Sequence, residues 1–139
     1  MSTTETKHLP KVIADHSQNM TGKVVVITGT TSGTGYICAR EVAKKGAKVV
    51  LLNRKSARSE ESLKKLQSEA PEAEFESIEC DLQSIASVED AIAWIKSKYE
   101  VVDVLVNNAG VMALEDRATE DGYDVQMQTN VLTHFLLTK

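Results

Sequence analysis

The sequence predicts an α/β fold built on a parallel sheet, and two observations lead to this prediction. Along the 139 residues, four short runs of strand-forming residues alternate with four helical patterns, without an internal linker or a repeat. A loop with three glycines joins the first run to the first helical pattern, an order typical of parallel α/β sheets. This alternation implies right-handed crossovers between parallel strands. The carboxyl ends of all four strands are therefore expected at one edge of the sheet, where such folds bind ligands.

The first strand and helix are predicted from their apolar residues. Val24–Thr28 is almost wholly apolar instead of alternating, which indicates a strand buried on both faces. Residues 36–45 place apolar side chains at helical spacing, and Gly46 is expected to end this helix because a glycine readily adopts the left-handed backbone there. The three-glycine loop between them is the central feature of the predicted fold.

The later elements follow from the same patterns. The second strand is β-branched and apolar, and the next helix turns Leu63 and Leu66 inward and ends before Pro71. The third strand alternates loosely, and the last helix contains the apolar residues Val125, Val131 and Leu132. The expected strands cover residues 24–28, 48–52, 75–80 and 102–106, and the expected helices cover 36–45, 56–70, 84–99 and about 119 to 139. This is a Rossmann-type three-layer αβα fold, incomplete because the full form has six strands.

Composition excludes several classes of function. Apolar residues make up 42% and charged residues 26% of the chain, and the formal net charge of −4 gives no electrostatic basis for binding nucleic acid or anionic membranes. No apolar run reaches the ~18–20 residues that a membrane span requires. Residues 1–20 are expected to form a polar arm without the apolar core of a secretory signal, and residues 21–139 to form one domain. Two cysteines form no disulfide framework, and a cytoplasmic location is expected.

The glycine loop is predicted to hold the phosphates of a dinucleotide. Glycines are needed where φ is positive and where a Cβ would block the pyrophosphate. The hydroxyl groups of the loop suit phosphate or ribose oxygens, although serine and threonine are also ordinary loop and N-cap residues. The loop residues assigned to cofactor binding are Gly29, Thr31, Ser32, Gly33, Thr34 and Gly35.

Two motifs together resemble the short-chain dehydrogenase/reductase family. The first is Thr28-Gly29-x-x-x-Gly33-x-Gly35, and the second is Asn107-Asn108-Ala109-Gly110. The resemblance covers about residues 20–139. Residues 119–123 and 130–138 further resemble the retinol-dehydrogenase-like branch, which includes the WW-domain oxidoreductases. Thr34 and Thr133 depart from the usual pattern of that branch.

The residues after the second strand favour NADP over NAD. An NAD site usually has a carboxylate here that binds the ribose hydroxyls, whereas this chain has Asn53 followed by Arg54. A carboxylate would repel a 2′-phosphate, and a guanidinium can bind one through two hydrogen bonds. Arg54 is the predicted phosphate ligand, with Lys55 and Arg58 as weaker candidates. The alternative is that Arg54 is simply a solvated side chain.

The resemblance implies roles for residues at the ends of the third and fourth strands. Asp81 would accept the adenine amino group and Leu82 would pack on the ring, although Asp81 could equally cap the helix that begins near Ser84. Asn130, expected to be buried within the last helix, would support a proton relay, whereas His134 is expected to be a packing or surface histidine. The other residues assigned to cofactor binding are Asn108, Ala109 and Gly110.

The reacting groups of that family are missing from the sequence. Its chemistry requires Tyr-x-x-x-Lys and an upstream serine, but no tyrosine here is followed four residues later by lysine. The chain is therefore interpreted as the N-terminal portion of an oxidoreductase acting on a small-molecule carbonyl or alcohol, with a homo-oligomer left open. The alternative is a catalytically incompetent nucleotide-binding or interaction module ending at residue 139, whose fourth strand would be an exposed edge. A methyltransferase-type fold is a third, more distant interpretation. Such folds also favour an acidic residue after the second strand, and Asn53 is not acidic.

Overall fold

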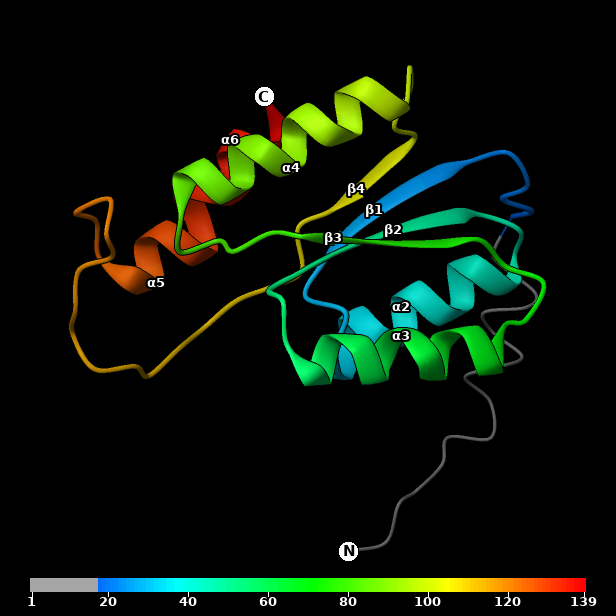
Figure 1. Ribbon diagram of the computed structural model, residues 1–139, viewed down its shortest axis with the longest axis horizontal. Coiled ribbons are helices and arrows are strands. Elements are labelled where there is room, and N and C mark those ends of the chain that lie inside the picture. Colours follow the sequence, from blue (N-terminus) through cyan, green and yellow to red (C-terminus); the bar gives the residue numbers. More distant parts are fainter. Residues whose placement is uncertain (1–17) are drawn as a thin grey trace, which may run out of the picture.

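The computed structural model describes residues 18–139 and confirms the predicted architecture (Figure 1). Most of the expected polar arm, with His8 and His16, lies outside the described residues. The four strands are parallel in the order β3-β2-β1-β4. No helix within residues 18–139 is long and apolar enough to cross a bilayer. The elements are β1 (Val24–Thr28), α2 (Gly33–Lys44), β2 (Lys48–Asn53), α3 (Ala57–Glu69), β3 (Phe75–Glu79), α4 (Ile85–Lys98), β4 (Val104–Val106), α5 (Val125–Met127), the π-helical turn η1 (Gln128–Leu132) and α6 (Thr133–Thr138).

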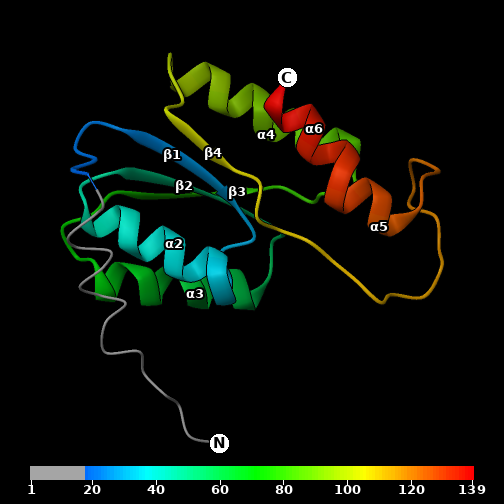
Figure 2. The ribbon, with the colours of Figure 1, turned by 180° about the vertical axis from the view of Figure 1, so that it is seen from behind.

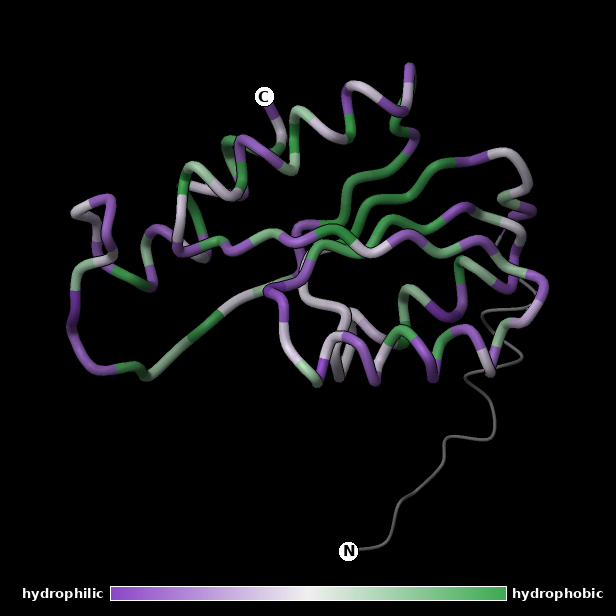
Figure 3. Tube along the Cα trace, in the orientation of Figure 1, coloured by the Kyte–Doolittle hydropathy of each residue, from purple (hydrophilic) through white to green (hydrophobic). Residues whose placement is uncertain are grey.

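Helices cover both faces of the sheet, which explains why the central strands are apolar throughout. α2 and α3 lie on one face and α4 and α6 on the other (Figures 1 and 2). Val25 and Ile27 of β1 pack in the cluster with α2 and α3, whereas Val26 packs in the cluster with α4. The central strands β1 and β2 are accordingly hydrophobic along most of their length in the chain trace (Figure 3). Burial on alternate faces therefore accounts for the unbroken apolar run from Val24 to Ile27 in β1.

The strand β4 forms one edge of the sheet and is shorter than predicted. It begins at Val104, two residues later than expected, and Val102 is 37% exposed. The reason is that the Asp103 carboxylate accepts the backbone N–H of Val24 at 2.8 Å and the Lys23 ammonium at 2.9 Å. The Asp103 side chain thus accepts the Val24 N–H, which would donate to a backbone carbonyl if β4 began earlier.

The last helix begins six residues later than the predicted start at Thr119. Thr119 donates its N–H to the Tyr123 carbonyl at 2.8 Å, and Gly122 adopts a positive φ of 84°, so this segment is a turn. Asp124 then caps the helix by accepting the Met127 N–H at 2.8 Å. The segment between β4 and α5 extends away from the sheet (Figures 1 and 2).

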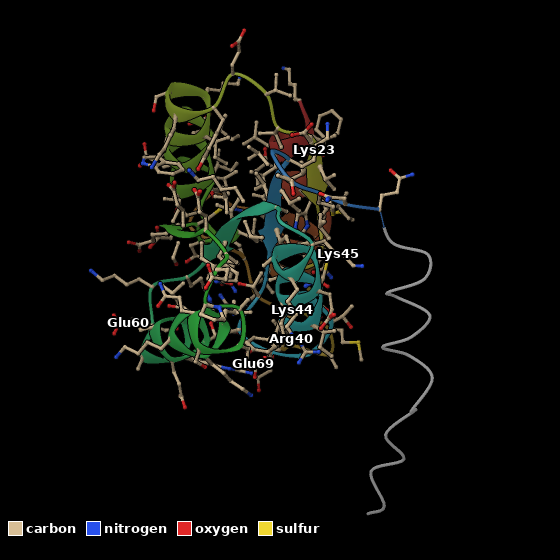
Figure 4. All side chains as sticks on the ribbon, turned by 90° about the vertical axis from the view of Figure 1, so that its right-hand side faces the viewer. Lys23, Arg40, Lys44, Lys45, Glu60 and Glu69 are labelled. Atoms are coloured by element: carbon tan, nitrogen blue, oxygen red, sulfur yellow. The ribbon has the colours of Figure 1, made fainter. Side chains whose placement is uncertain are left out.

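The helices α2 and α3 are joined by charged side chains at a distance from the glycine loop. Arg40 of α2 lies 3.4 Å from the Glu69 carboxylate of α3, and the two side chains lie near each other in Figure 4. Both are partly exposed, so this pair stabilises the fold by only about 0–1 kcal/mol. The N-termini of the same two helices lie at the opposite end, where the polar loops gather.

Candidate functional site

A cleft of about 370 Å³ lies at the carboxyl ends of the strands, where the sequence predicts a cofactor site. Segments after β1, β2, β3 and β4 all contribute to its walls, which confirms that the carboxyl ends of the four strands meet at one edge of the sheet. Gly33, Thr34, Gly35 and Asn130, although assigned to the site, are not among its lining residues. The assigned residues that do line it are Gly29, Thr31, Ser32, Asn53, Arg54, Asp81, Leu82, Asn108, Ala109 and Gly110.

Two glycines of the loop are required by close backbone packing. Gly29 has a φ of +71°, and a Cβ there would lie 2.8 Å from the Cα of Ala109. A Cβ on Gly35 would overlap the Gly29 carbonyl oxygen and the side-chain nitrogen of Asn108. The loop therefore folds closely against the β4 turn. Gly35 allows the close packing of Gly29 and Asn108 but does not line the cleft.

Asn53 holds the glycine loop in place. Its Oδ1 accepts the backbone N–H of Thr30 at 2.8 Å, and its Nδ2 donates to Thr30 Oγ1 at 2.8 Å. Both residues are buried. The sequence analysis interpreted Asn53 only in terms of cofactor preference. In the structure Asn53 also fastens β2 to the glycine loop.

Two arginines lie between the end of β2 and the first turn of α3. Arg54 lines the cleft directly after β2, and Arg58 donates from Nη2 to Ser32 Oγ at 2.9 Å. Ser56 caps α3 by accepting the Ser59 N–H at 3.1 Å, so the positive end of the helix dipole adds to the two guanidinium charges. Arg58, which sequence reasoning ranked below Arg54, is therefore directly bonded to the glycine loop.

Arg58 also lines a second cleft that adjoins the first one. The two clefts share Thr31, Ser32 and Arg58 as lining residues. Gly33, Glu61 and Lys65 line the second cleft but not the first, so the start of α2, one carboxylate and another cation lie there. Helix N-termini and cations together favour the binding of anions such as phosphate.

Asp81 lines the cleft and also shapes the entry to α4. Its Oδ1 accepts the Gln83 N–H at 2.9 Å, while the N-cap of α4 is Ser84, whose hydroxyl accepts the Ser87 N–H at 3.3 Å. Asp81 therefore stabilises the turn that precedes the helix and does not cap the helix itself. Leu82 is buried beside it.

Thr28 organises the turn after β4, and sequence reasoning gave it no role in the site. Its Oγ1 accepts the backbone N–H groups of Asn108 and Ala109, both at 3.0 Å. The Asn108 side chain donates in return to the carbonyl oxygens of Thr28 at 3.1 Å and Gly29 at 3.0 Å. These bonds tie the end of β1 to the turn after β4 through Asn108. The available sequence signal was a single hydroxyl residue ending an otherwise apolar strand.

The Asn130 side chain is exposed, contrary to the expectation that it is buried. It lies on the π-helical turn and faces the backbone of Val111, accepting its N–H at 2.8 Å and donating to its carbonyl at 2.7 Å. Both polar ends of the amide are therefore satisfied. A Cβ on Gly110 would approach Asn130 Oδ1 to 3.4 Å, so this turn also packs closely against η1.

Two buried titratable groups remain neutral near the cleft. Burial raises the pKa of the Cys80 thiol to about 11, with a further contribution from the charge of Asp81. Cys80 lines the cleft as a protonated thiol and is a poor nucleophile. Burial also lowers the pKa of His134, partly offset by its bond to the Asn130 carbonyl. His134 was expected to be a packing or surface residue, and it is buried.

The geometry of the cleft fits a phosphorylated dinucleotide. Gly29 and Gly110 place no side chains on two of its walls, and Ser32, the N-cap of α2, makes no capping hydrogen bond with its side chain. Backbone amides at the start of α2 and the two guanidinium groups would neutralise phosphate charge. Asp81 and Leu82, which line the cleft after β3, offer the acceptor and the apolar surface that an adenine ring requires.

Comparison with known sequences agrees with this geometry. Residues 23–139 match the profile of the family described as short chain dehydrogenase. An uncharacterized oxidoreductase of Schizosaccharomyces pombe is 38% identical over 130 residues, covering 94% of this chain and 38% of that protein. Human retinol dehydrogenase 13 is 38% identical over 117 residues, covering 84% of this chain and 35% of that protein. The WW domain-containing oxidoreductase of Pongo abelii is also 38% identical, over 88% of this chain and 30% of that protein.

Solved structures share the same fold. A protein of Mycobacterium paratuberculosis superposes with a TM-score of 0.77 at 37% identity, over 90% of this chain and 43% of that one. L-sorbose reductase of Gluconobacter frateurii, solved with NADPH and L-sorbose, superposes with a TM-score of 0.69 at 28% identity, over 86% of this chain and 46% of that one. The chain thus spans less than half the length of each of these five proteins.

Proposed function

Because this chain belongs to the short chain dehydrogenase family, we propose that it holds the cofactor of an NADP-dependent oxidoreductase that interconverts a carbonyl and an alcohol on a small molecule. When bound, the nicotinamide cofactor supplies or accepts the hydride of such a reaction. No Tyr-x-x-x-Lys occurs in the 139 residues. The proposal therefore assigns cofactor binding to this chain and the proton-transfer groups to other parts of the protein.

The observation that carries the NADP preference is the charge at the end of β2. This strand ends in the amide of Asn53 instead of a carboxylate, and Arg54 and Arg58 follow at the cleft. A carboxylate at this position would repel a 2′-phosphate, whereas guanidinium groups bind phosphate oxygens through paired hydrogen bonds. The NADPH complex of the similar L-sorbose reductase supports the same cofactor class.

The remaining residues have defined roles in this proposal. The glycine loop and the N-terminus of α2 would bind the pyrophosphate, and Asp81 and Leu82 would bind the adenine. The Asn108–Gly110 turn would bind the ribose beside the nicotinamide. Asn130, whose side chain holds the Val111 backbone, would position the last helix for the proton relay.

The test compares NADPH and NADH binding to the purified chain. We expect tighter binding of NADPH, because only NADPH has the 2′-phosphate, and we expect Arg54→Ala to weaken NADPH but not NADH. Arg58→Ala should weaken NADPH more than NADH, since Arg58 also bonds to Ser32 of the glycine loop, which both cofactors would contact. Loss of a charged hydrogen bond corresponds to roughly a tenfold or greater rise in Kd. Lys64→Ala is the matched control, since Lys64 is an exposed cation of α3 outside the cleft linings. Equal affinities for the two cofactors, or arginine variants indistinguishable from Lys64→Ala, would refute the NADP preference.

A further inference from the structure

We infer that His134 is a positioning residue of the cofactor site, acting through the Thr28 hydroxyl to hold the Asn108–Ala109 turn. The inference rests on the proposed function, since it assigns a role within the same cleft. The observation behind it is a chain of hydrogen bonds from α6 through β1 to the turn after β4. His134 Nε2 lies 2.8 Å from Thr28 Oγ1, and the two residues are 106 positions apart in the sequence.

The partners of His134 determine which ring nitrogen carries the proton. Nδ1 lies 3.4 Å from the backbone carbonyl oxygen of Asn130, which can only accept. A proton on Nδ1 satisfies this carbonyl and leaves Nε2 with a free lone pair facing Thr28. The opposite tautomer would place a lone pair against the carbonyl, and the two would repel. His134 is therefore the acceptor in its bond with Thr28.

The Thr28 hydroxyl then uses all of its hydrogen-bonding capacity. It donates its single proton to His134, and its two lone pairs accept the N–H groups of Asn108 and Ala109 at 3.0 Å each. The other acceptor within reach of the proton is the Val106 carbonyl at 3.5 Å, a considerably longer contact. His134 thus directs the hydroxyl proton away from the turn, and both lone pairs remain available to the two amides.

This arrangement matters for the cleft because the turn is one of its walls. Asn108 and Ala109 both line the cleft, and Ala109 packs against Gly29 of the glycine loop. A hydroxyl that is free to rotate would no longer present two lone pairs to the turn at all times. The backbone beside the cofactor would then sample other positions, and binding would lose part of its preorganisation.

The site is also shielded from water, which strengthens these bonds. Thr28 is fully buried, and His134 is 6% exposed. Burial lowers the pKa of the His134 imidazole, and its bond to the Asn130 carbonyl offsets this only in part. A neutral hydrogen-bonded imidazole therefore suits this position, and an apolar replacement would remove the acceptor without adding another.

The experiment measures the Kd of NADPH for the purified chain in a double-mutant cycle. His134→Leu should raise the Kd by roughly three- to tenfold, the equivalent of one neutral hydrogen bond. His134→Gln, whose carbonyl oxygen can accept the Thr28 proton, should restore most of the affinity. In a Thr28→Val background the hydroxyl is absent, so His134→Leu should have no additional effect. The amide NMR signals of Asn108 and Ala109 should move in His134→Leu and return in His134→Gln.

Controls separate this role from a general loss of stability. Leu66→Ala removes a fully buried side chain from the opposite face of the sheet, so it should destabilise the fold without changing the Kd. Phe135→Ala, next to His134 but 71% exposed, should leave both quantities unchanged. The inference is overturned if His134→Leu binds NADPH as the unmodified chain does, or if its effect is the same with valine at position 28. If the unmodified chain binds neither NADPH nor NADH, the proposed function itself fails.

Discussion

The link between Asn53 and Thr30 yields a prediction that tests how the glycine loop is held. Asn53→Leu keeps the approximate volume of the side chain but removes both hydrogen bonds, each 2.8 Å long. Thr30 is fully buried, so its backbone N–H and its hydroxyl would lose their partner without gaining water. Each unpaired buried group costs about 1–3 kcal/mol, and the hydroxyl recovers part of its cost by rotating. We expect a loss of about 2–4 kcal/mol in the free energy of unfolding.

The assay is urea unfolding followed by the fluorescence of Trp94, the single tryptophan of the chain. Asn53→Asp is the matched control, because a carboxylate can accept from both the Thr30 N–H and its hydroxyl after rotation. This variant should lose no more than about 1 kcal/mol, since charge-assisted bonds offset part of the desolvation cost. The added charge should weaken NADPH more than NADH.

Two outcomes would contradict this reasoning. If Asn53→Leu loses less than about 1 kcal/mol, the loop is held by other contacts, such as those of Asn108 with Gly29. If Asn53→Asp is as unstable as Asn53→Leu, hydrogen bonding is not the origin of the effect. An unchanged preference between NADPH and NADH in Asn53→Asp would separate the loop function from the cofactor function.

Three further predictions concern single residues near the cleft. Gly35→Ala should lose at least about 2 kcal/mol of unfolding free energy, measured in urea, because the added Cβ would overlap backbone atoms. Gly33→Ala should lose less, because its Cβ would meet open space and only its positive φ is unfavourable. Equal losses in the two variants would contradict this packing. Cys80 should resist iodoacetamide at pH 8 in the native chain and react in urea, as followed by mass spectrometry, because its pKa of about 11 leaves roughly one thiolate per thousand thiols; rapid native labelling would refute this. The pKa of His134 is lower in the folded chain than in the unfolded chain, so on acidification the unfolded chain binds a proton first. The contribution of His134 to stability is therefore fully present above its ordinary pKa of 6.5 and falls as the pH drops below that value. In urea unfolding, His134→Gln should lack this part of the pH dependence.

Much of the fold could be predicted because burial leaves a local pattern. β1 is apolar from Val24 to Ile27 because Val25 faces one helical layer and Val26 the other, and this run appears directly in the sequence. Its predicted bounds agree with the structure residue for residue. The common edge at which the loops of the cleft meet also follows from the alternation of strands and helices, because parallel strands all end at the same side of the sheet.

Predictions failed or were incomplete where a side chain competes with the backbone. Asp103 shortens β4 by taking the Val24 N–H, and Asp124 delays the last helix by capping it. The apolar pattern of the last helix is the same whether it begins at Thr119 or at Val125. Periodicity therefore identifies a helix but does not locate the residue at which hydrogen bonding changes.

The sequence by itself determined the parallel α/β architecture, the glycine loop and the family to which the chain belongs. Only the tertiary structure decided how the hydroxyl and amide groups are used: Asn53 bonds to Thr30, and His134 bonds to Thr28 across 106 positions. The physical reason is that burial is recorded in the local order of apolar residues, whereas a hydrogen bond requires two particular atoms at about 3 Å. Which atoms reach that distance depends on how the crossovers bring β1, β4 and α6 together, and no local pattern records it.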